Sequence, residues 1–208
     1  MPDSRLTKRI FYEDYNNCKF NWSFEVKLIA QEINMINEFT TRSNFNINMA
    51  WAILTENFTK EWKERLNNTS KLVLYKSFKE TIGVENYVLH THSTAQRSIF
   101  AKLRAGVLPL AIETGRWRNK QRKNRVCTLC SNGEVEDEIH FLFRCQIYQS
   151  KRTLFFNRLT DIIENFEDLT MSEKLKIIMS ENCVKYTVPF VYNIYVKRCN
   201  ILYIYTDT

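Results

Sequence analysis

Apolar residues recur at steps of three and four along several stretches of the chain, which places them on one face of an α-helix. Two such stretches, 25–39 and 46–65, lie in the N-terminal third. The first carries Val26, Ile29, Ile33 and Ile36, and the second carries Ile47, Trp51, Leu54, Phe58 and Trp62. We predict a helix for each stretch, with the aromatic side chains of the second in a core.

A further helix is marked at both ends. Ser93 is a suitable N-cap and Gly106 a suitable C-terminal stop. Arg97 and Arg104 are seven residues apart in this segment, so we expect both on one side of the helix, opposite its apolar stripe. Amphipathic patterns also predict helices over 146–166, over 172–180 and from Pro189 onward, where the Tyr and Ile content leaves a strand open as the alternative.

Two short tracts are ambiguous between helix and strand. Apolar residues cluster in 71–76 and alternate with polar ones in 87–91, so short strands are allowed there. The chain of 208 residues has only 4 Gly and 3 Pro, which argues against a turn-rich β fold. We therefore expect a mainly α protein with an inserted zinc module. Its three parts are an N-terminal helical region (1–92), a basic helix, loop and zinc-binding module (93–150), and a C-terminal helical region (151–208).

The formal net charge of +7 is concentrated in one segment. Residues 97–125 hold nine basic residues and a single acid, Glu113, so this segment carries +8 and the rest of the chain −1. A localised excess of this kind favours contact with a polyanion, although a solvated basic loop or a nuclear-localisation signal would give the same composition. Our candidate nucleic-acid contacts are Arg97, Arg104, Arg116, Trp117, Arg118, Lys120, Arg122, Lys123 and Arg125.

Four candidate metal ligands follow the basic segment. Two residues separate Cys127 from Cys130, nine separate Cys130 from His140, and four separate His140 from Cys145. A Cys-x-x-Cys pair can hold one ion through a tight turn, and a Cys-Cys-His-Cys set without a position for water is typical of structural zinc. We expect a turn over 131–133, a short helix over 136–143 presenting His140, and one Zn²⁺ whose anionic site is stabilised by Arg125 and Arg144.

Other interpretations of these residues were weighed. A redox pair would leave His140 and Cys145 without a purpose, a disulfide is disfavoured because no secretory signal is seen, and free cysteines can also pack as small apolar residues. The remaining cysteines, Cys18, Cys183 and Cys199, lack ligand spacing and are expected to be buried thiols. His90 and His92 are expected to be ordinary surface or core histidines.

Several runs resemble a known family. They are Gln96–Pro109, continuing through Gly115 and Trp117, then Asn124–Cys130 and Val135–Cys145. Together they resemble the zinc-binding region C-terminal to the reverse transcriptase of non-LTR (LINE-type) retrotransposons, firmly over about residues 94–156. The resemblance implies zinc bound by Cys127, Cys130, His140 and Cys145. It also implies a role in holding RNA or DNA for a reverse transcriptase, which becomes a candidate partner. The nine-residue gap differs from the four of the retroviral nucleocapsid knuckle, so that compact fold is not implied.

Catalysis is not expected of this chain. A polymerase needs paired aspartates for its metal ions, and the nearest string, Tyr12–Tyr15, lacks the second Asp. We therefore expect a non-catalytic, zinc-stabilised nucleic-acid-binding region. The alternatives are a zinc-bearing protein-docking module or a remnant of a transposable element without function. The charged N-terminus and the absence of a long apolar run favour an intracellular protein away from membranes, and the basic run allows a nuclear one.

Overall fold

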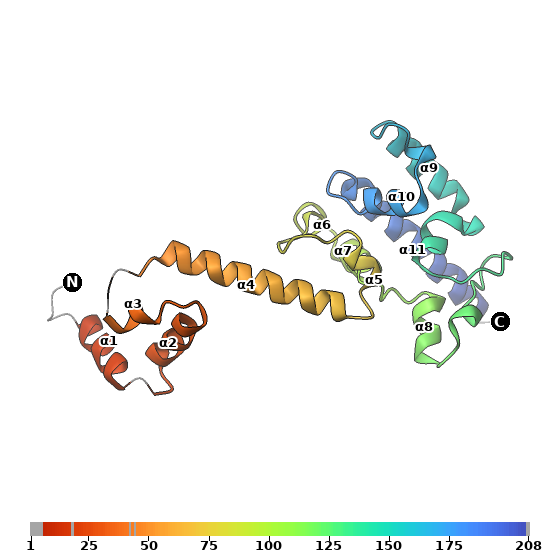
Figure 1. The fold of residues 1–208 in the computed structure, drawn as a ribbon. Helices are drawn as coiled ribbons and strands as arrows, with labels where there is room; N and C mark the ends of the chain where they lie inside the picture. Colours follow the sequence, from red (N-terminus) through yellow and green to blue (C-terminus); the bar gives the residue numbers. More distant parts are fainter. Residues whose placement is uncertain (1–5, 18, 42, 44, 207–208) are drawn as a thin grey trace. The chain divides into compact units, whose positions relative to one another are not determined.

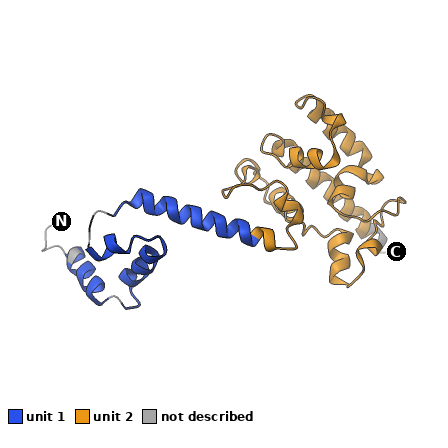
Figure 2. Ribbon diagram, in the orientation of Figure 1, with its two compact units in different colours: residues 1–65 blue, residues 66–208 orange. Residues whose placement is uncertain are grey.

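The computed structural model describes residues 6–17, 19–41, 43 and 45–206, and the chain divides into two compact units, 1–65 and 66–208 (Figure 2). The regular structure of the described residues is helical, which confirms the predicted fold class (Figure 1). The α-helices are α1 Leu6–Asn17, α2 Trp22–Glu32, α3 Ile36–Thr41, α4 Ile47–Asn68, α5 Val73–Lys76, α6 Asn86–His90, α7 Thr94–Arg104, α8 Ala111–Trp117, α9 Gln149–Thr160, α10 Met171–Ile178 and α11 Val184–Thr206. The shorter turns are the 3-10 helices η1 Arg122–Asn124, η3 Gln146–Tyr148 and η4 Phe166–Asp168, and the π-helix η2 His140–Arg144.

The first unit has a small core and leaves large apolar side chains in solvent. Ile33 and Met35, in the break between α2 and α3, pack with Ala50 of α4. The single helix predicted over 25–39 is wrong, since the chain forms α2 and α3 there. Asn34, between them, has a φ of 57°, which interrupts a right-handed helix. On α4 the core-facing side carries Ala50, whereas Trp51 is 72% exposed. The prediction that the α4 aromatics form a core is therefore wrong for Trp51 and for Phe58, which is 59% exposed.

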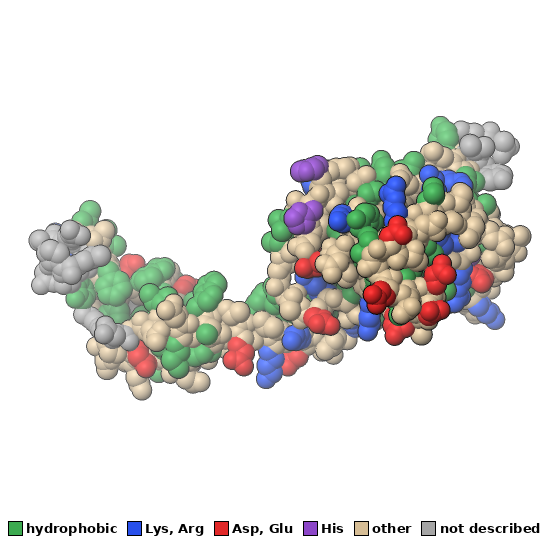
Figure 3. All heavy atoms as spheres, turned by 90° about the horizontal axis from the view of Figure 1, so that it is seen from above, with side chains coloured by type: hydrophobic (Ala, Val, Ile, Leu, Met, Phe, Trp, Pro, Cys, Tyr) green, Lys and Arg blue, Asp and Glu red, His purple; other side chains and the backbone are tan. Residues whose placement is uncertain are grey.

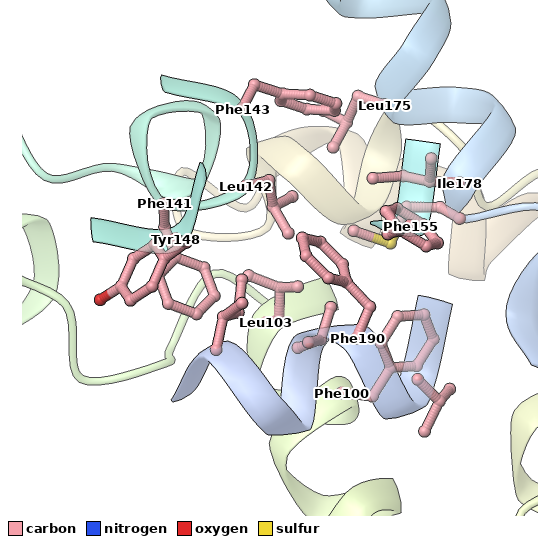
Figure 4. Packing of buried hydrophobic residues seen from close by; sticks show 14 of the residues in the cluster. Phe100, Leu103, Phe141, Leu142, Phe143, Tyr148, Phe155, Leu175, Ile178 and Phe190 are labelled. Atoms are coloured by element: carbon pink, nitrogen blue, oxygen red, sulfur yellow. The ribbon is translucent and has the colours of Figure 1, made fainter. Parts of the chain in front are cut away.

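The second unit is built around one larger hydrophobic core (Figure 4). Phe100 of α7 is fully buried, and Phe155 of α9 stacks on Phe190 of α11 with ring centroids 4.2 Å apart. Each fully buried Phe side chain stabilises the folded state by about 1.5–3 kcal/mol. This core joins residues from the expected middle region, including Phe141, to those of the C-terminal region.

The ends of α7 follow the sequence signals. Ser93 is the N-cap and its Oγ accepts a hydrogen bond from the Gln96 backbone N at 3.4 Å. Gly106 has a φ of +66°, a left-handed conformation that ends a helix and that other residues adopt only with strain. The helix predicted between these two residues is confirmed.

The short strands allowed at 71–76 and 87–91 are absent, because these tracts form α5 and α6. Tyr87 of α6 is buried and packs edge-on against Phe100, with ring centroids 5.1 Å apart. A single apolar anchor of this kind can fix a short helix whatever the local strand propensity. The β-structure recorded among the described residues is an isolated antiparallel bridge, Val126 with Val135.

The C-terminal helices differ in part from the predicted ranges. The predicted helix over 146–166 is interrupted, because the chain forms η3 and then α9, which ends at Thr160, and η4 begins only at Phe166. The predicted helix over 172–180 is α10, which spans 171–178. Helix α11 begins at Val184, before Pro189, so proline lies inside the helix rather than at its start. Within the described residues, no helix combines the length and apolar character needed to cross a bilayer.

Candidate metal centre

The four predicted ligands come together. The Sγ atoms of Cys127, Cys130 and Cys145 and a ring nitrogen of His140 all lie within 4.8 Å of one another. Ligands bound tetrahedrally to one ion at zinc distances are separated by about 3.3–3.8 Å. The measured separations therefore need only a small contraction to close on a metal ion, and the cluster is compatible with a metal site.

A narrow antiparallel turn presents the first two cysteines. Cys127 N donates to Glu134 O at 2.9 Å, and Glu136 N donates to Arg125 O at 3.0 Å, on either side of the Val126–Val135 bridge. These bonds close the loop that carries Cys130 and the predicted turn at 131–133. Gly133 adopts a φ of +65° there, which explains the need for glycine. The loop is thus fixed by its backbone at the point where Cys127 enters the cluster.

A single π-helical turn presents the other two ligands. The sequence predicts an ordinary short helix over 136–143, but the chain forms a π-helix, His140–Arg144, with Cys145 N donating to His140 O at 2.8 Å. His140 is the first residue of this wider turn, and Cys145 directly follows its last residue. Asp137 Oδ1 accepts the His140 backbone N–H at 2.9 Å and so holds the start of this turn. Single π-turns frequently mark functional sites in helices.

The orientation of the His140 ring is set by Glu134, a residue that the sequence reasoning did not single out. His140 Nδ1 lies 2.8 Å from Glu134 Oε2, and Cys130 Sγ lies 3.4 Å from Nε2. In the tautomer that donates its Nδ1–H to the carboxylate, the Nε2 lone pair faces Cys130. Metal-binding histidines are usually oriented by such a second partner. An acid six residues before the histidine was the available signal.

Arg152 of α9 is the buried cation beside the cluster. Its Nε donates to Leu142 O and its Nη2 to Cys145 O, both at 2.8 Å. It is 3% exposed, and its remaining recorded acceptor is the uncharged amide of Gln149. The predicted stabilisers Arg125 and Arg144 do not take this role, since Arg125 bonds Lys120 O and Ile112 O and Arg144 is exposed. Arg152 therefore supplies the positive charge that a three-thiolate metal site calls for.

The surroundings of the thiols favour the thiolate form that binds a metal. A hydrogen bond from Cys145 stabilises the Cys127 thiolate and lowers its pKa, helped by His140 and the backbone N–H groups of Leu129 and Cys130. The same bond raises the pKa of Cys145. Burial disfavours the His140 cation, but hydrogen bonds with Cys127 and Glu134 outweigh it and raise the His140 pKa. One thiolate is thus stabilised in advance, and a bound cation would displace the remaining protons.

Helix α8 and the basic stretch that follows it are tied to residues 127–145, which carry the four candidate ligands and which we call the metal-binding segment. Glu136 Oε2 accepts the Ala111 backbone N–H at 2.7 Å, and Glu136 O accepts Ile112 N at 3.1 Å. The carboxylate therefore caps the start of α8, where no local side chain does so. Arg125 then returns across α8 through its bond to Ile112 O at 2.9 Å.

Arg104, a predicted phosphate contact, is buried instead. It is 4% exposed and donates to Glu85 Oε2 at 2.7 Å and to Met179 O at 3.0 Å. Its guanidinium lies 4.2 Å from the Phe78 ring centroid, and burial lowers its pKa. The expected exposed position is wrong because the α5–α6 segment covers this side of α7 with the acid that pairs Arg104.

Two further predicted contacts are engaged with the backbone. Arg97 is half-buried and donates to the carbonyls of Thr91 and His92. Arg125 is half-buried, with Nη2 2.7 Å from Lys120 O. Both side chains hold loops in place through these bonds. They are less exposed than the six candidates that remain.

The other six candidates are exposed along one stretch, which runs from the last two residues of α8 into η1. Five are cations and one is aromatic, and they are Arg116, Trp117, Arg118, Lys120, Arg122 and Lys123. Arg116 pairs with Glu113 at 3.1 Å and Arg122 with Asp137 at 3.4 Å. For Arg118, Lys120 and Lys123 no ion pair is recorded with any described residue. We refer to these six residues as the basic loop. Figure 3 shows that Lys and Arg side chains are interspersed with acidic ones on the drawn face of the second unit.

A groove of about 310 Å³ adjoins the basic loop, between α8, the turn that carries Cys127 and the end of α11. Arg118 and Lys120 line it with the polar side chains of Asn124 and Thr128.

Of the other cysteines and histidines, Cys183 is buried as predicted, whereas Cys199 is exposed and that expectation is wrong. Cys18 lies outside the described residues. His90 and His92 are exposed.

Comparison with known proteins gives no further guide. No protein-family model, no curated protein and no solved structure matches the chain.

Proposed function

We propose that the second unit is a zinc-stabilised, non-catalytic module that binds nucleic acid through the basic loop. The observation that carries this proposal is the attachment of the loop to the metal-binding segment at both of its ends. Glu136 caps the helix before the loop, and Arg125, at the end of the loop, accepts the Glu136 backbone N–H through its carbonyl. Metal binding would therefore hold the cations in place.

Zinc is the metal that best fits the donors. Three thiols and one imidazole form a soft set with no carboxylate ligand, and the four ligands leave no position for a catalytic water. Glu134 and Arg152 supply the outer contacts that such a site needs. The bound ion would have a structural role, and its binding energy would add to the folding energy of this segment.

The basic loop has the two kinds of group that unpaired nucleic acid requires. Arg118, Lys120 and Lys123 are exposed cations able to approach phosphates. Trp117 is 65% exposed, and its indole N–H donates to the buried carboxylate of Glu113 at 3.1 Å. The ring is therefore held with much of its surface open to stack on a base, a contact worth about 1–3 kcal/mol.

The resemblance to the zinc-binding region of non-LTR retrotransposon proteins supports the same proposal. In that setting the module would help a reverse transcriptase hold its RNA template or DNA target, in the nucleus where target DNA lies. Phosphate contacts carry no sequence information, so we propose binding without sequence preference.

The test is the salt dependence of binding by the full, zinc-loaded chain. Fluorescence anisotropy with a labelled single-stranded RNA and a labelled DNA duplex would measure affinity across salt concentrations. Three to five neutralised phosphates on the duplex give a slope of log affinity against log salt of about −2.7 to −4.5. A slope near zero would contradict the proposal.

Charge-reversing variants locate the contact. Replacing Arg118, Lys120 and Lys123 together with Glu should abolish measurable binding, because the loop would then repel phosphates. The matched control replaces the exposed lysines Lys63, Lys102 and Lys176 with Glu and changes net charge equally. Equal losses in both variants would show that overall charge, and not the basic loop, is responsible.

A further inference from the structure

A second cationic site lies away from the basic loop, in a groove of about 220 Å³ between α9 and α11. Its lining includes three cations, Lys151, Arg158 and Lys185, and no acidic residue. No hydrogen bond or ion pair is recorded between these three side chains and any described residue. Three unpaired cations around one hollow favour a negatively charged occupant.

The floor and rim of the groove are apolar. Phe155 and Phe190 form the floor, and Pro189 and Leu154 also line the groove. Leu154 is 67% exposed, although it lies on the same face of α9 as Lys151 and Arg158, at steps of three and four residues. The groove therefore combines positive charge with an exposed aliphatic contact, which a purely phosphate-binding surface does not need.

The aromatic rings of the groove are not available for base stacking. Phe155 and Phe190 lie face to face at an interplanar angle of 8°, and they are 5% and 6% exposed. The ammonium group of Lys185 lies 4.8 Å from the Tyr186 ring centroid and covers that ring. Binding of single strands depends on open aromatic faces, as Trp117 has in the basic loop. This difference disfavours a nucleic acid in the groove.

Pro189 adds a hydrogen-bond acceptor. Proline has no N–H, so the carbonyl of Lys185, four residues earlier in α11, loses the donor that it would have in an uninterrupted helix. Both residues line the groove. A polypeptide can offer a backbone N–H at such a position, whereas the phosphodiester backbone of DNA has no donor.

From these features we infer that the α9–α11 groove is a docking site for an acidic segment of a protein partner that inserts an apolar side chain. The carboxylates of the segment would meet Lys151, Arg158 and Lys185, and its apolar residue would contact Leu154 and Pro189. This inference does not depend on nucleic-acid binding by the basic loop. It assigns the second unit a protein contact on a separate surface.

The test uses the full, zinc-loaded chain and a fluorescein-labelled peptide, Asp-Glu-Asp-Leu-Phe-Glu-Asp, followed by anisotropy. The groove variant replaces Arg158 and Lys185 with Glu, and the control variant replaces Lys102 and Lys176, exposed residues outside the groove, with Glu. We expect the groove variant to lose at least about tenfold in affinity and the control to change by less than about threefold. Equal losses would overturn the inference, because they would show a general charge effect.

The apolar part of the inference has its own test. A peptide with Ser in place of Leu and Phe should bind the chain at least about tenfold more weakly, and Leu154→Ser should weaken the original peptide while leaving the exposed side of α9 folded. Full affinity in either experiment would contradict the insertion of an apolar side chain into the groove.

A labelled oligothymidylate should bind the groove variant almost as well as the wild-type chain. If the groove variant loses affinity for the oligothymidylate but not for the peptide, the occupant is a nucleic acid and the inference fails. If only the basic-loop variant loses affinity for the oligothymidylate, the result supports the proposed function and leaves the groove assigned to the peptide.

Discussion

Glu136 and Arg198 form a two-pronged ion pair inside the second unit. Glu136 Oε1 accepts from Arg198 Nε and Oε2 accepts from Nη2, each at 2.8 Å, although the residues are 62 positions apart. Glu136 is 2% exposed and Arg198 8% exposed. Glu136 also caps α8 through the Ala111 N–H. One carboxylate thus joins the metal-binding segment, the start of α8 and α11.

Removing the charge of Glu136 should destabilise the second unit strongly. Glu136→Gln leaves Arg198 buried without its counter-charge, an effect that costs about 3–5 kcal/mol when one partner of a buried pair is lost. Urea unfolding of the zinc-loaded chain would measure the change. The double variant Glu136→Gln, Arg198→Met removes both charges and should recover part of the loss. Failure of the double variant to recover any stability would show that the pairing is not the cause.

Arg152 should control metal affinity. Arg152→Met removes the donors to Leu142 O and Cys145 O and the buried positive charge next to the thiolates. Loss of an outer contact of a metal site typically weakens binding by about 10–100-fold, which competition with a chelator would measure. Arg144→Met is the matched control, because Arg144 precedes Cys145 but is exposed. Similar losses in both variants would assign the effect to long-range charge rather than to the hydrogen bonds.

Withdrawal of the metal should loosen the chain locally. Residues 110–150 contain the metal-binding segment, α8 and the basic loop, whereas α7 and α9 also each contact α11 directly. Hydrogen–deuterium exchange before and after chelation should therefore show the largest gain of exchange in 110–150. A uniform gain over residues 66–208 would mean that the metal supports the whole core.

The metal ligands and the major helices were predictable because their signals are local. Cys127 and Cys130 share one turn, and Ser93 caps the helix that starts at the next residue. The partners Glu136 and Arg198 were not predictable, since nothing in the spacing of two residues from different helices and loops tells which of many charges will meet. Long-range pairs of this kind follow from packing alone.

The candidate nucleic-acid contacts in residues 97–125 illustrate the same limit. From the sequence, Arg104 and Arg118 were both predicted to contact phosphates. In the structure the α5–α6 segment packs over Arg104 and pairs it with Glu85, whereas Arg118 stays exposed. Two aromatic residues of α4 show the opposite error, because they were predicted to be buried and are exposed. The period of the apolar positions predicted the helix correctly, but the first unit covers only the face that contains Ala50 and leaves Trp51 exposed.

Arg104 should contribute to stability and not to nucleic-acid binding. Arg104→Met leaves Glu85 half-buried with Lys79 as its remaining ion-pair partner and removes the bond to Met179 O. The free energy of unfolding should therefore fall by about 2–4 kcal/mol. Affinity for RNA, measured on chain shown to be folded by circular dichroism, should change less than about twofold. Lys102→Met, an exposed change on the same helix, is the control for stability. A large loss of affinity in folded Arg104→Met would restore this residue to the binding surface.

Gly115 should be required for the geometry of the basic loop. A Cβ at this position would lie 2.6 Å from Arg125 Cγ and 2.9 Å from its Cδ, closer than carbon atoms approach. Gly115→Ala would therefore push Arg125 away from the carbonyls of Lys120 and Ile112 that it braces, at a cost of about 1–3 kcal/mol. We expect lower nucleic-acid affinity with zinc content unchanged, measured by anisotropy and by metal analysis on the same sample. Unchanged affinity in Gly115→Ala would contradict this requirement.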